Sequence, residues 1–319
     1  MKRLWHTREL STVLILALEI AFFTWYLWPG GGRSHPFFNL SNALLVLKYS
    51  SIYGIAAIGA AIVIISGGID LAPGAIIALT SVVTGWCFVE HGWPLAASAG
   101  AGLLSGAAAG LVSSWLIVRV GLPPFIATLG VMGIARGIAC IITEARYYVL
   151  SRSIPPGSRL IGLPIDWIAP VVMIGAGLVF QALMKRFQWG RAVFAIGGNE
   201  TAAIFTGIAV GTIKTSVYVV AGLLASASGI VLAVAQGQGK ADLATGYELD
   251  IIASAVVGGA SLAGGRGSVV GAVLGALIFG VLRNALPQIP GATFYDRLIV
   301  GIVVIVIVVL DQLFVRHER

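Results

Sequence analysis

Charged residues are scarce in this sequence: only 10% of its 319 residues are Asp, Glu, Lys or Arg, whereas 58% are hydrophobic. A soluble globular domain has about a quarter charged residues. The low charge, together with a mean hydropathy of +0.97, excludes a soluble fold for most of the chain. Only two cysteines occur, Cys87 and Cys140, both within apolar runs. A disulfide framework or a zinc site is therefore not expected.

A basic face and an ATP-binding loop are also missing. The formal net charge of +7 comes from Lys and Arg scattered between apolar runs, which is typical of topology signals and contacts with anionic lipids, not of nucleic-acid binding. The segment most like a phosphate-binding loop, Gly237-Gln238-Gly239-Lys240-Ala241, lacks the first Gly and the Ser/Thr of that motif. We expect no bound cofactor or metal, no catalytic residue and no enzyme activity.

Ten apolar runs approach the roughly 20 residues that cross a bilayer as a helix. The sequence therefore predicts an all-α integral membrane protein, with some helices interrupted, that forms one domain over residues 1–319. The first run follows basic residues and lacks a small-residue cleavage site, so it is interpreted as a retained span and not as a signal peptide. The runs are 11–28, 43–65, 75–89, 95–118, 125–143, 165–184, 212–235, 249–263, 268–285 and 296–313.

The distribution of Lys and Arg predicts the orientation in the membrane. With the N-terminus inside, eleven of the twenty Lys and Arg residues fall in cytoplasmic joints, including both ends of the chain and the cluster 185–191. We expect both termini in the cytoplasm. The run 249–263 is short and interrupted by glycine, so a half-helix that does not cross is the alternative, and parity would then place the C-terminus outside.

Glycine follows two patterns. The segments Gly67–Gly74 and Gly258–Gly265 share Gly-Gly-x-x-Leu-Ala-x-Gly, each at a break between apolar runs. Transporters often contain structural repeats with interrupted helices near the solute pathway, so the two segments indicate a repeat, with coincidence as the alternative. Two ladders at spacing four predict tight helix packing or, alternatively, a dimer contact: Gly102-Gly106-Gly110 and Gly267-Gly271-Gly275.

The region of about 185–210 predicts a short helix outside the bilayer. Asn199 is a good N-cap, Glu200 follows in the first turn where the helix dipole favours an anion, and Gly207 can end the helix in the left-handed conformation. Such a short helix is not stable alone. We expect it to dock into a partner and to transmit that partner's movement to the spans; an ordinary solvated connection is the alternative.

Charged residues within or beside the spans are candidates for the solute pathway. Asp70 is either the N-cap of the next helix or a pathway residue, and Glu248 either forms a capping box with Thr245 or faces the outer mouth together with Asp250. Arg136 lies mid-span beside two glycines and is a further candidate. Glu19 and Lys48 fall at similar depth on consecutive spans, so we expect them to form an intramembrane ion pair.

Several motifs resemble those of one transporter family. The run Glu200-x-Ala202-Ala203-x-x-x-Gly207 is similar to the EAA-type cytoplasmic loop of ABC importer permeases. Further motifs are similar to the ribose, xylose and galactose type permeases and run in family order from about residue 40 to 310: Ser66-Gly67-Gly68-Ile69-Asp70-Leu71, Pro123-Pro124-Phe125-Ile126-Ala127-Thr128-Leu129-Gly130, Gly190-Arg191-x-Val193-Phe194-Ala195-Ile196-Gly197-Gly198-Asn199-Glu200, Gly246-Tyr247-Glu248-Leu249-Asp250 and Gly258-Gly259-Ala260-Ser261-Leu262.

The resemblance implies a bacterial inner-membrane permease subunit of a simple-sugar ABC importer. An ATPase subunit would dock at Arg191, Asn199, Glu200, Ala202, Ala203 and Gly207, a periplasmic sugar-binding protein would dock outside, and a second permease subunit, identical or related, would complete the pathway. Phe125 and Thr128 join Asp70, Arg136, Glu248 and Asp250 as pathway candidates. Ala72-Pro73 and Ala260 depart from the Ser-Val and Thr that are usual in the family, which leaves the sugar unspecified.

Other transport and enzyme classes fit less well. Related permeases carry branched-chain amino acids or signalling sugars, but the few mid-span charges favour a neutral sugar. A proton- or sodium-driven transporter needs carboxylates or histidines within the spans, whereas all four histidines lie in or beside loops. They are His6, His35, His91 and His317. A membrane enzyme needs a nucleophile with a base, or a metal cluster, at workable spacing, and no such group stands out.

Overall fold

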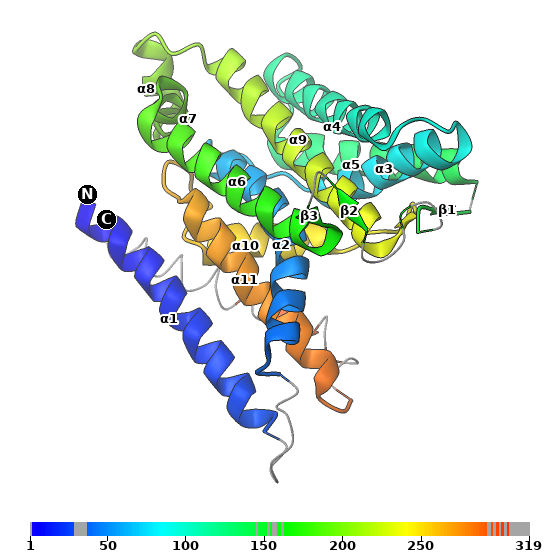
Figure 1. Cartoon of the computed structure of the whole chain (residues 1–319). Coiled ribbons are helices and arrows are strands. Elements are labelled where there is room, and N and C mark those ends of the chain that lie inside the picture. Colours follow the sequence, from blue (N-terminus) through cyan, green and yellow to red (C-terminus); the bar gives the residue numbers. More distant parts are fainter. Residues whose placement is uncertain are drawn as a thin grey trace.

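The structure is a computed structural model, and it describes residues 2–28, 37–144, 146–151, 154, 158–160, 163–291, 295, 298–299, 301–302 and 305. Helices dominate this part of the chain, and eight helical segments in it are long and apolar enough to cross a membrane. The predicted all-α integral membrane fold is confirmed. Figure 1 shows the helices packed side by side in one bundle, with α1 along one edge.

The helices follow the apolar runs closely. Their bounds are α1 (Lys2–Tyr26), α2 (Leu40–Ile65), α3 (Pro73–Gly85), α4 (Leu95–Val118), α5 (Pro124–Thr143), α6 (Ile165–Arg186), α7 (Gln188–Gly198), α8 (Glu200–Phe205), α9 (Val210–Gln236), α10 (Tyr247–Val257) and α11 (Val269–Ala285). A π-helical turn over Trp86–Glu90 extends α3. Two short antiparallel pairs join β1 (Tyr148–Val149) to β4 (Gln238–Gly239), and β2 (Arg159–Leu160) to β3 (Leu163–Pro164).

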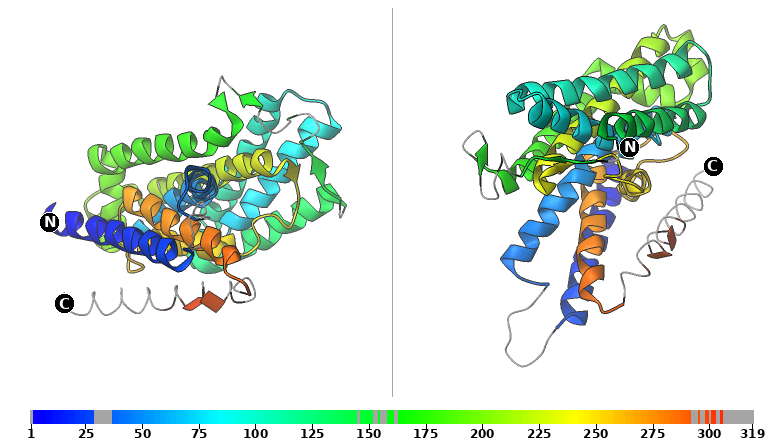
Figure 2. Two further views of the ribbon diagram at one scale, coloured as in Figure 1. Left: turned by 60° about the horizontal axis from the view of Figure 1, so that its bottom comes forward. Right: turned by 90° about the vertical axis from the view of Figure 1, so that its right-hand side faces the viewer.

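Helix α2 forms the centre of the bundle. Every residue from Ser50 to Ile65 is buried, and α2 packs against α6, α9, α10 and α11. The view nearly along α2 shows it surrounded by the other helices (Figure 2, left). Outer helices instead expose large apolar side chains such as Leu104, Trp115 and Leu178, as expected where lipid is the solvent.

Both glycine ladders are packing seams within the chain. A side chain at Gly106 or Gly110 would overlap the backbone of α9, and one at Gly275 or Gly271 would overlap the backbone of α10 or of its C-cap, Gly258. The absent side chains therefore let α4 approach α9, and let α11 approach α10, at backbone contact. The interpretation of the ladders as packing seams is confirmed.

Helix α10 is too short to cross a bilayer. Its 11 residues extend about 16 Å at the usual rise, against a hydrocarbon core of roughly 30 Å. The run 249–263 is thus a half-helix followed by a turn, and its inclusion among the spans was wrong. The run 296–313 falls almost wholly outside the described residues. The predicted count of about ten spans therefore stands at eight candidates in the described part, and the location of the C-terminus stays a prediction.

The predicted Glu19–Lys48 ion pair is wrong. Helix α1 packs against α11 instead of α2, and Lys48 forms its ion pair with Asp166 at the start of α6. A buried oxygen of Glu19, Oε2, has no hydrogen-bond partner among the residues that the structure describes. Similar depth on consecutive spans did not predict contact, because the helix that follows α1 in sequence is not its neighbour.

Helices α1 and α11 run parallel. The Ser268 hydroxyl, just before α11, donates a hydrogen bond to Glu9 at 2.6 Å, and Phe23 near the end of α1 packs with Val281 and Ala285 near the end of α11. The N-terminal half of α1 and the start of α11 therefore lie at one end of the bundle. Figure 1 shows α7 and α8 toward that same side, with β1 toward the opposite side.

Candidate functional site

The short helix α8 has the caps that the sequence predicts. The Asn199 side chain accepts a hydrogen bond from the Ala202 N–H at 2.9 Å, which satisfies one of the free donors of the first turn. Gly207 has a φ of +82°, and the N–H groups of Gly207 and Ile208 bond to the carbonyls of Ile204 and Ala203. This ending matches the Schellman pattern. The predicted doubly capped helix is confirmed.

Ion pairing joins α8 to the next span. Glu200 accepts a hydrogen bond from Lys214 of α9 at 2.6 Å, and Ala203 is buried on the inner face of α8. Arg191 is exposed on α7 and donates to the Arg186 carbonyl. Of the residues predicted to meet a partner, Glu200 and Ala203 thus position α8 on its own chain, whereas Arg191 and Ala202 are exposed.

The outward face of α8 carries two large apolar side chains. Ile204 is 56% exposed and Phe205 is 86% exposed, although α8 itself falls between the candidate spans α6 and α9. Apolar side chains this exposed mark a candidate contact surface, either for another protein or for the membrane surface. Sequence reasoning missed both residues because it followed the caps and the Glu-x-Ala-Ala motif, although the apolar pair lies inside that motif.

Helix α7 meets the core at a junction made almost entirely of glycine. A Cβ atom at Gly197 would overlap the Ile65 carbonyl oxygen at the end of α2. That same oxygen accepts a hydrogen bond from the Gly265 N–H at 2.9 Å. A Cβ atom at Gly264 would lie 2.6 Å from the Gly197 carbonyl oxygen and 3.0 Å from the Gly67 Cα. Ile65, Gly67, residues 197–198 and residues 264–265 therefore touch through backbone atoms; we call them the glycine junction.

Asp70 and Thr128 hold the connection between α2 and α3. Asp70 is buried, and its Oδ1 accepts from the Ala72 N–H at 2.8 Å, an Asx turn. The N-cap of α3 is Ala72, followed by Pro73 at the first helical position, so Asp70 is not the N-cap. Thr128 of α5 accepts from the Leu71 N–H at 3.1 Å. Burial raises the pKa of the Asp70 carboxyl to about 6, and the bond from Ala72 opposes this shift.

Arg136 fixes the segment that precedes α10. Its guanidinium donates to the carbonyls of Ala241 and Leu243 at 2.6 and 2.8 Å. The predicted capping box at this helix is wrong: the N-cap is Gly246, with a φ of +89°, and Thr245 instead bonds to the Asp242 carbonyl. A glycine in the left-handed region turns the chain here in place of a side-chain cap.

Three pathway candidates differ in their surroundings. Glu248 places a carboxylate oxygen against Gly74 of α3, and Phe125 is half exposed on α5. Asp250 is fully buried and accepts a hydrogen bond from Arg283 of α11 at 2.7 Å. The structure thus places Asp70 and Thr128 on the same connection, where Thr128 of α5 bonds to Ile69 and Leu71 on either side of Asp70. It joins Asp250 to α11, whereas Phe125 is half exposed.

Comparison with known proteins identifies the family. A profile described as "Branched-chain amino acid transport system / permease component" matches residues 42–308. The chain belongs to this permease family. The matched segment includes α2 from its third residue onward, every later candidate span up to α11, and α7, α8 and the glycine junction. The permease is therefore a multi-pass membrane protein, as its apolar helices also indicate.

Curated relatives of the permease cover most of its length. It is 36% identical over 287 residues to the ribose import permease protein RbsC of Escherichia coli (strain K12), which covers 88% of each chain. It is 32% identical to the D-allose transport system permease protein AlsC of the same strain, covering 95% of this chain and 91% of that one. The fructose import permease protein FrcC of Rhizobium meliloti is 31% identical, with 94% and 84% covered. The resemblance to sugar importer permeases is confirmed.

Proposed function

We propose that this chain is the membrane-spanning permease of an ATP-driven ABC importer, that its cargo is a simple sugar, and that an ATPase subunit docks on α8. The exposed pair Ile204 and Phe205 on a helix outside the candidate spans is the observation that carries the docking site. The named cargoes of the relatives, ribose, D-allose and fructose, support the sugar. A periplasmic sugar-binding protein and a second permease subunit complete the transporter in the bacterial inner membrane.

Movement of the ATPase reaches the core through the glycine junction. Closure of two ATPase subunits on ATP would shift α8, and α7 precedes it with only Asn199 between them. The end of α7 touches the end of α2 at Ile65, and touches the α10–α11 connection at Gly264 and Gly265, in each case through backbone atoms. Packed backbone contacts move as one body because the interior has little free volume. The displacement of α8 therefore biases the helices that enclose the pathway.

An amino-acid cargo is the main alternative, since the family description names branched-chain amino acids. An ion-driven transporter is a second. Purification in mild detergent separates an ABC permease from an ion-driven transporter, since only the ABC permease is recovered together with a stoichiometric ATPase. The purified complex is then reconstituted into vesicles, and its uptake of a labelled sugar is compared with its uptake of a labelled branched-chain amino acid to separate the two cargoes.

The docking surface is tested with Phe205→Glu. A carboxylate within an apolar contact loses both the packing and its own hydration, so we expect recovery of the ATPase to fall about tenfold or more, as for a central interface residue. Trp93→Glu is the matched control, because Trp93 is also an exposed aromatic residue outside the candidate spans but lies between the π-helical turn and α4, away from α8. Equal recovery of the ATPase with both variants would remove α8 as the docking element.

A further inference from the structure

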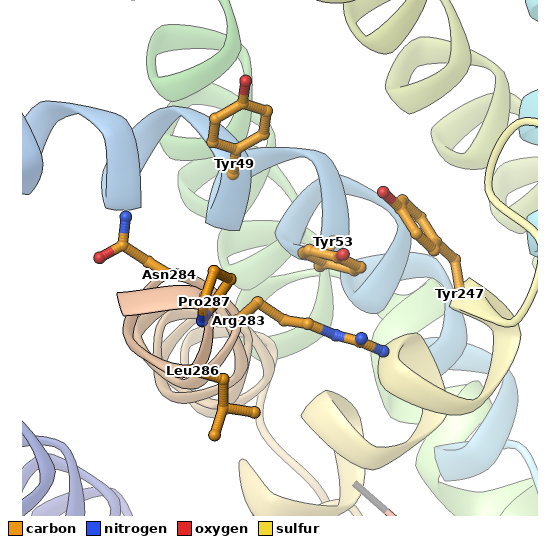
Figure 3. A pocket seen from close by; sticks show the side chains of 8 residues that line it. Tyr49, Tyr53, Tyr247, Arg283, Asn284, Leu286 and Pro287 are labelled. Carbon is orange, nitrogen blue, oxygen red and sulfur yellow. The ribbon is translucent and has the colours of Figure 1, made fainter. Parts of the chain in front are cut away.

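A cavity of about 510 Å³ lies between α2, α10 and α11. Its lining includes Tyr49 and Tyr53 of α2, Tyr247 of α10, and Arg283 and Asn284 of α11 (Figure 3). This volume lies within the range of small-molecule sites, which combine apolar or aromatic walls with a few placed polar groups. None of these five residues stood out in the sequence as a pathway candidate, although Tyr247 lies within one of the family motifs.

The polar groups of this cavity are held in fixed positions. Arg283 is anchored by Asp250, which is fully buried and bonds to it at 2.7 Å. The rings of Tyr53 and Tyr247 lie 4.6 Å apart between centroids. Figure 3 shows Arg283 reaching from α11 past Tyr53 toward α10. Three helices therefore converge on one site, in which Arg283 is fixed by Asp250 and the Tyr53 and Tyr247 rings pack together. Such fixation lowers the cost of binding.

The charge of the site decides between classes of cargo. Arg283 is the only charged side chain among the lining residues within the described part of the chain, and Asp250 balances it. A carboxylate-bearing solute would meet no net positive charge there. The phenol rings, the amide of Asn284 and the guanidinium instead offer flat apolar faces and hydrogen-bonding groups, which suit an uncharged solute with several hydroxyl groups.

The cavity lies at the end of the bundle opposite to α7 and α8. It is formed by the last residues of α11, which pack beside Phe23 near the end of α1, whereas the glycine junction precedes the start of α11. If α8 faces the cytoplasm, as the proposed function requires, the cavity lies toward the outer side. A solute released outside the membrane reaches this end first.

We infer that this cavity is a binding site for a neutral monosaccharide on its way into the pathway, with Arg283 and Asn284 as its hydrogen-bonding groups and Tyr53 and Tyr247 as its wall. This inference rests on the proposed function and names the place where cargo is held. Asp250 is a positioning residue: it fixes Arg283 and cancels its charge.

Protection from alkylation tests the site without requiring transport. Asn284→Cys is placed in a background with Cys87→Ala and Cys140→Ala, and the permease complex is treated with a maleimide in the presence of D-ribose, D-allose, D-fructose or leucine. At a sugar concentration of twice the dissociation constant, alkylation should slow about threefold. Tyr147→Cys, exposed outside the cavity, should be alkylated at the same rate with and without each solute. Protection by no sugar, or by leucine alone, overturns the site.

Uptake by proteoliposomes that contain the complete transporter supplies the second measurement. Arg283→Gln should lower sugar uptake about tenfold, because the lost hydrogen bond is to a charged donor, and Tyr147→Ala should not. Recovery of the ATPase shows that each variant assembles. Where Arg283→Gln fails to assemble, Asn284→Ala and the double variant Arg283→Gln with Asp250→Asn replace it, since the double variant leaves no buried charge unpaired.

The two measurements separate the inference from the proposed function. Suppose that the wild type takes up sugar, that no sugar protects Asn284→Cys from alkylation, and that the Arg283 and Asn284 variants take up sugar like the wild type. The cavity is then not a binding site, and the proposed function still stands. If a sugar protects Asn284→Cys but the complex transports neither D-ribose, D-allose nor D-fructose, the proposed function is wrong and the cavity is still a binding site.

Discussion

The connection from α2 to α3 and the connection from α10 to α11 begin with the same hydrogen bonds. The N–H groups of Gly67 and Gly68 bond to the carbonyls of Ile64 and Val63, and those of Gly259 and Ala260 bond to Val256 and Ala255. Gly67 and Gly259 have φ values of +86° and +94°. The structural match therefore pairs Gly67 with Gly259, one residue away from the alignment of the two glycine motifs in the sequence.

After this shared start the two connections differ. The first, residues 66–72, is held by the Asx turn of Asp70 and by Thr128 of α5. The second, residues 258–268, continues through two more glycines in the left-handed region, Gly264 and Gly265, and reaches the end of α7. The start of the first connection also lies against the end of α7, at Ile65 and Gly67. The two connections therefore share that contact and differ in what else holds them: a side-chain anchor in the first, and two further left-handed glycines in the second.

The largest expected effect comes from breaking the packing of α7 against both connections. In Gly197→Ala the new methyl group would overlap the Ile65 carbonyl oxygen, a backbone atom that also accepts the Gly265 hydrogen bond. Overpacking of this kind costs about 3 kcal/mol. We expect a matching loss in the free energy of unfolding, measured by titration of the detergent-solubilised permease with sodium dodecyl sulfate, together with loss of ATP-driven uptake.

The adjacent glycine is a close control for that variant. A Cβ atom at Gly198 has no neighbour within 4 Å, although both glycines lie at the end of α7 and gain similar helix propensity as alanine. Gly198→Ala should unfold like the wild type and retain uptake. If the two variants unfold and transport alike, the glycine junction does not link α7 to the core.

Thr128→Val is expected to have the second largest effect, confined to the first connection. Valine has nearly the shape of threonine but cannot accept the Leu71 N–H, and a buried donor left without its acceptor costs about 2 kcal/mol. The same unfolding titration measures the loss. Thr128→Ser keeps the hydroxyl group and should lose less than Thr128→Val; the reverse order would show that the methyl group, not the hydrogen bond, holds this turn.

The sequence predicted the features that depend on local chemistry. Eight of the ten apolar runs, the caps at Asn199 and Gly207 and the glycine seams follow from residue type and spacing within one segment, and the structure confirms these. The ion pairs were not predictable in the same way. Lys48 bonds to Asp166, and Asp250 bonds to Arg283, because the packing order of helices, which no local pattern carries, decides which charges meet.

The smallest expected effect tests whether the endings of α2 and α10 are energetically equivalent. Alanine at Gly67 or Gly259 would occupy the left-handed region, which costs an L-residue about 1 kcal/mol. Packing adds nothing at Gly67, where a Cβ atom would meet only the Gly197 Cα, at 3.7 Å. We therefore expect Gly67→Ala and Gly259→Ala to lower the free energy of unfolding by the same amount in the same titration.

Gly133→Ala, in the middle of α5 with open space around its Cβ position, is the control and should leave the free energy of unfolding unchanged. Unequal losses in the free energy of unfolding would mean that the two connections, although they share the same hydrogen bonds and φ values, differ in backbone strain. Their resemblance would then be geometric but not energetic.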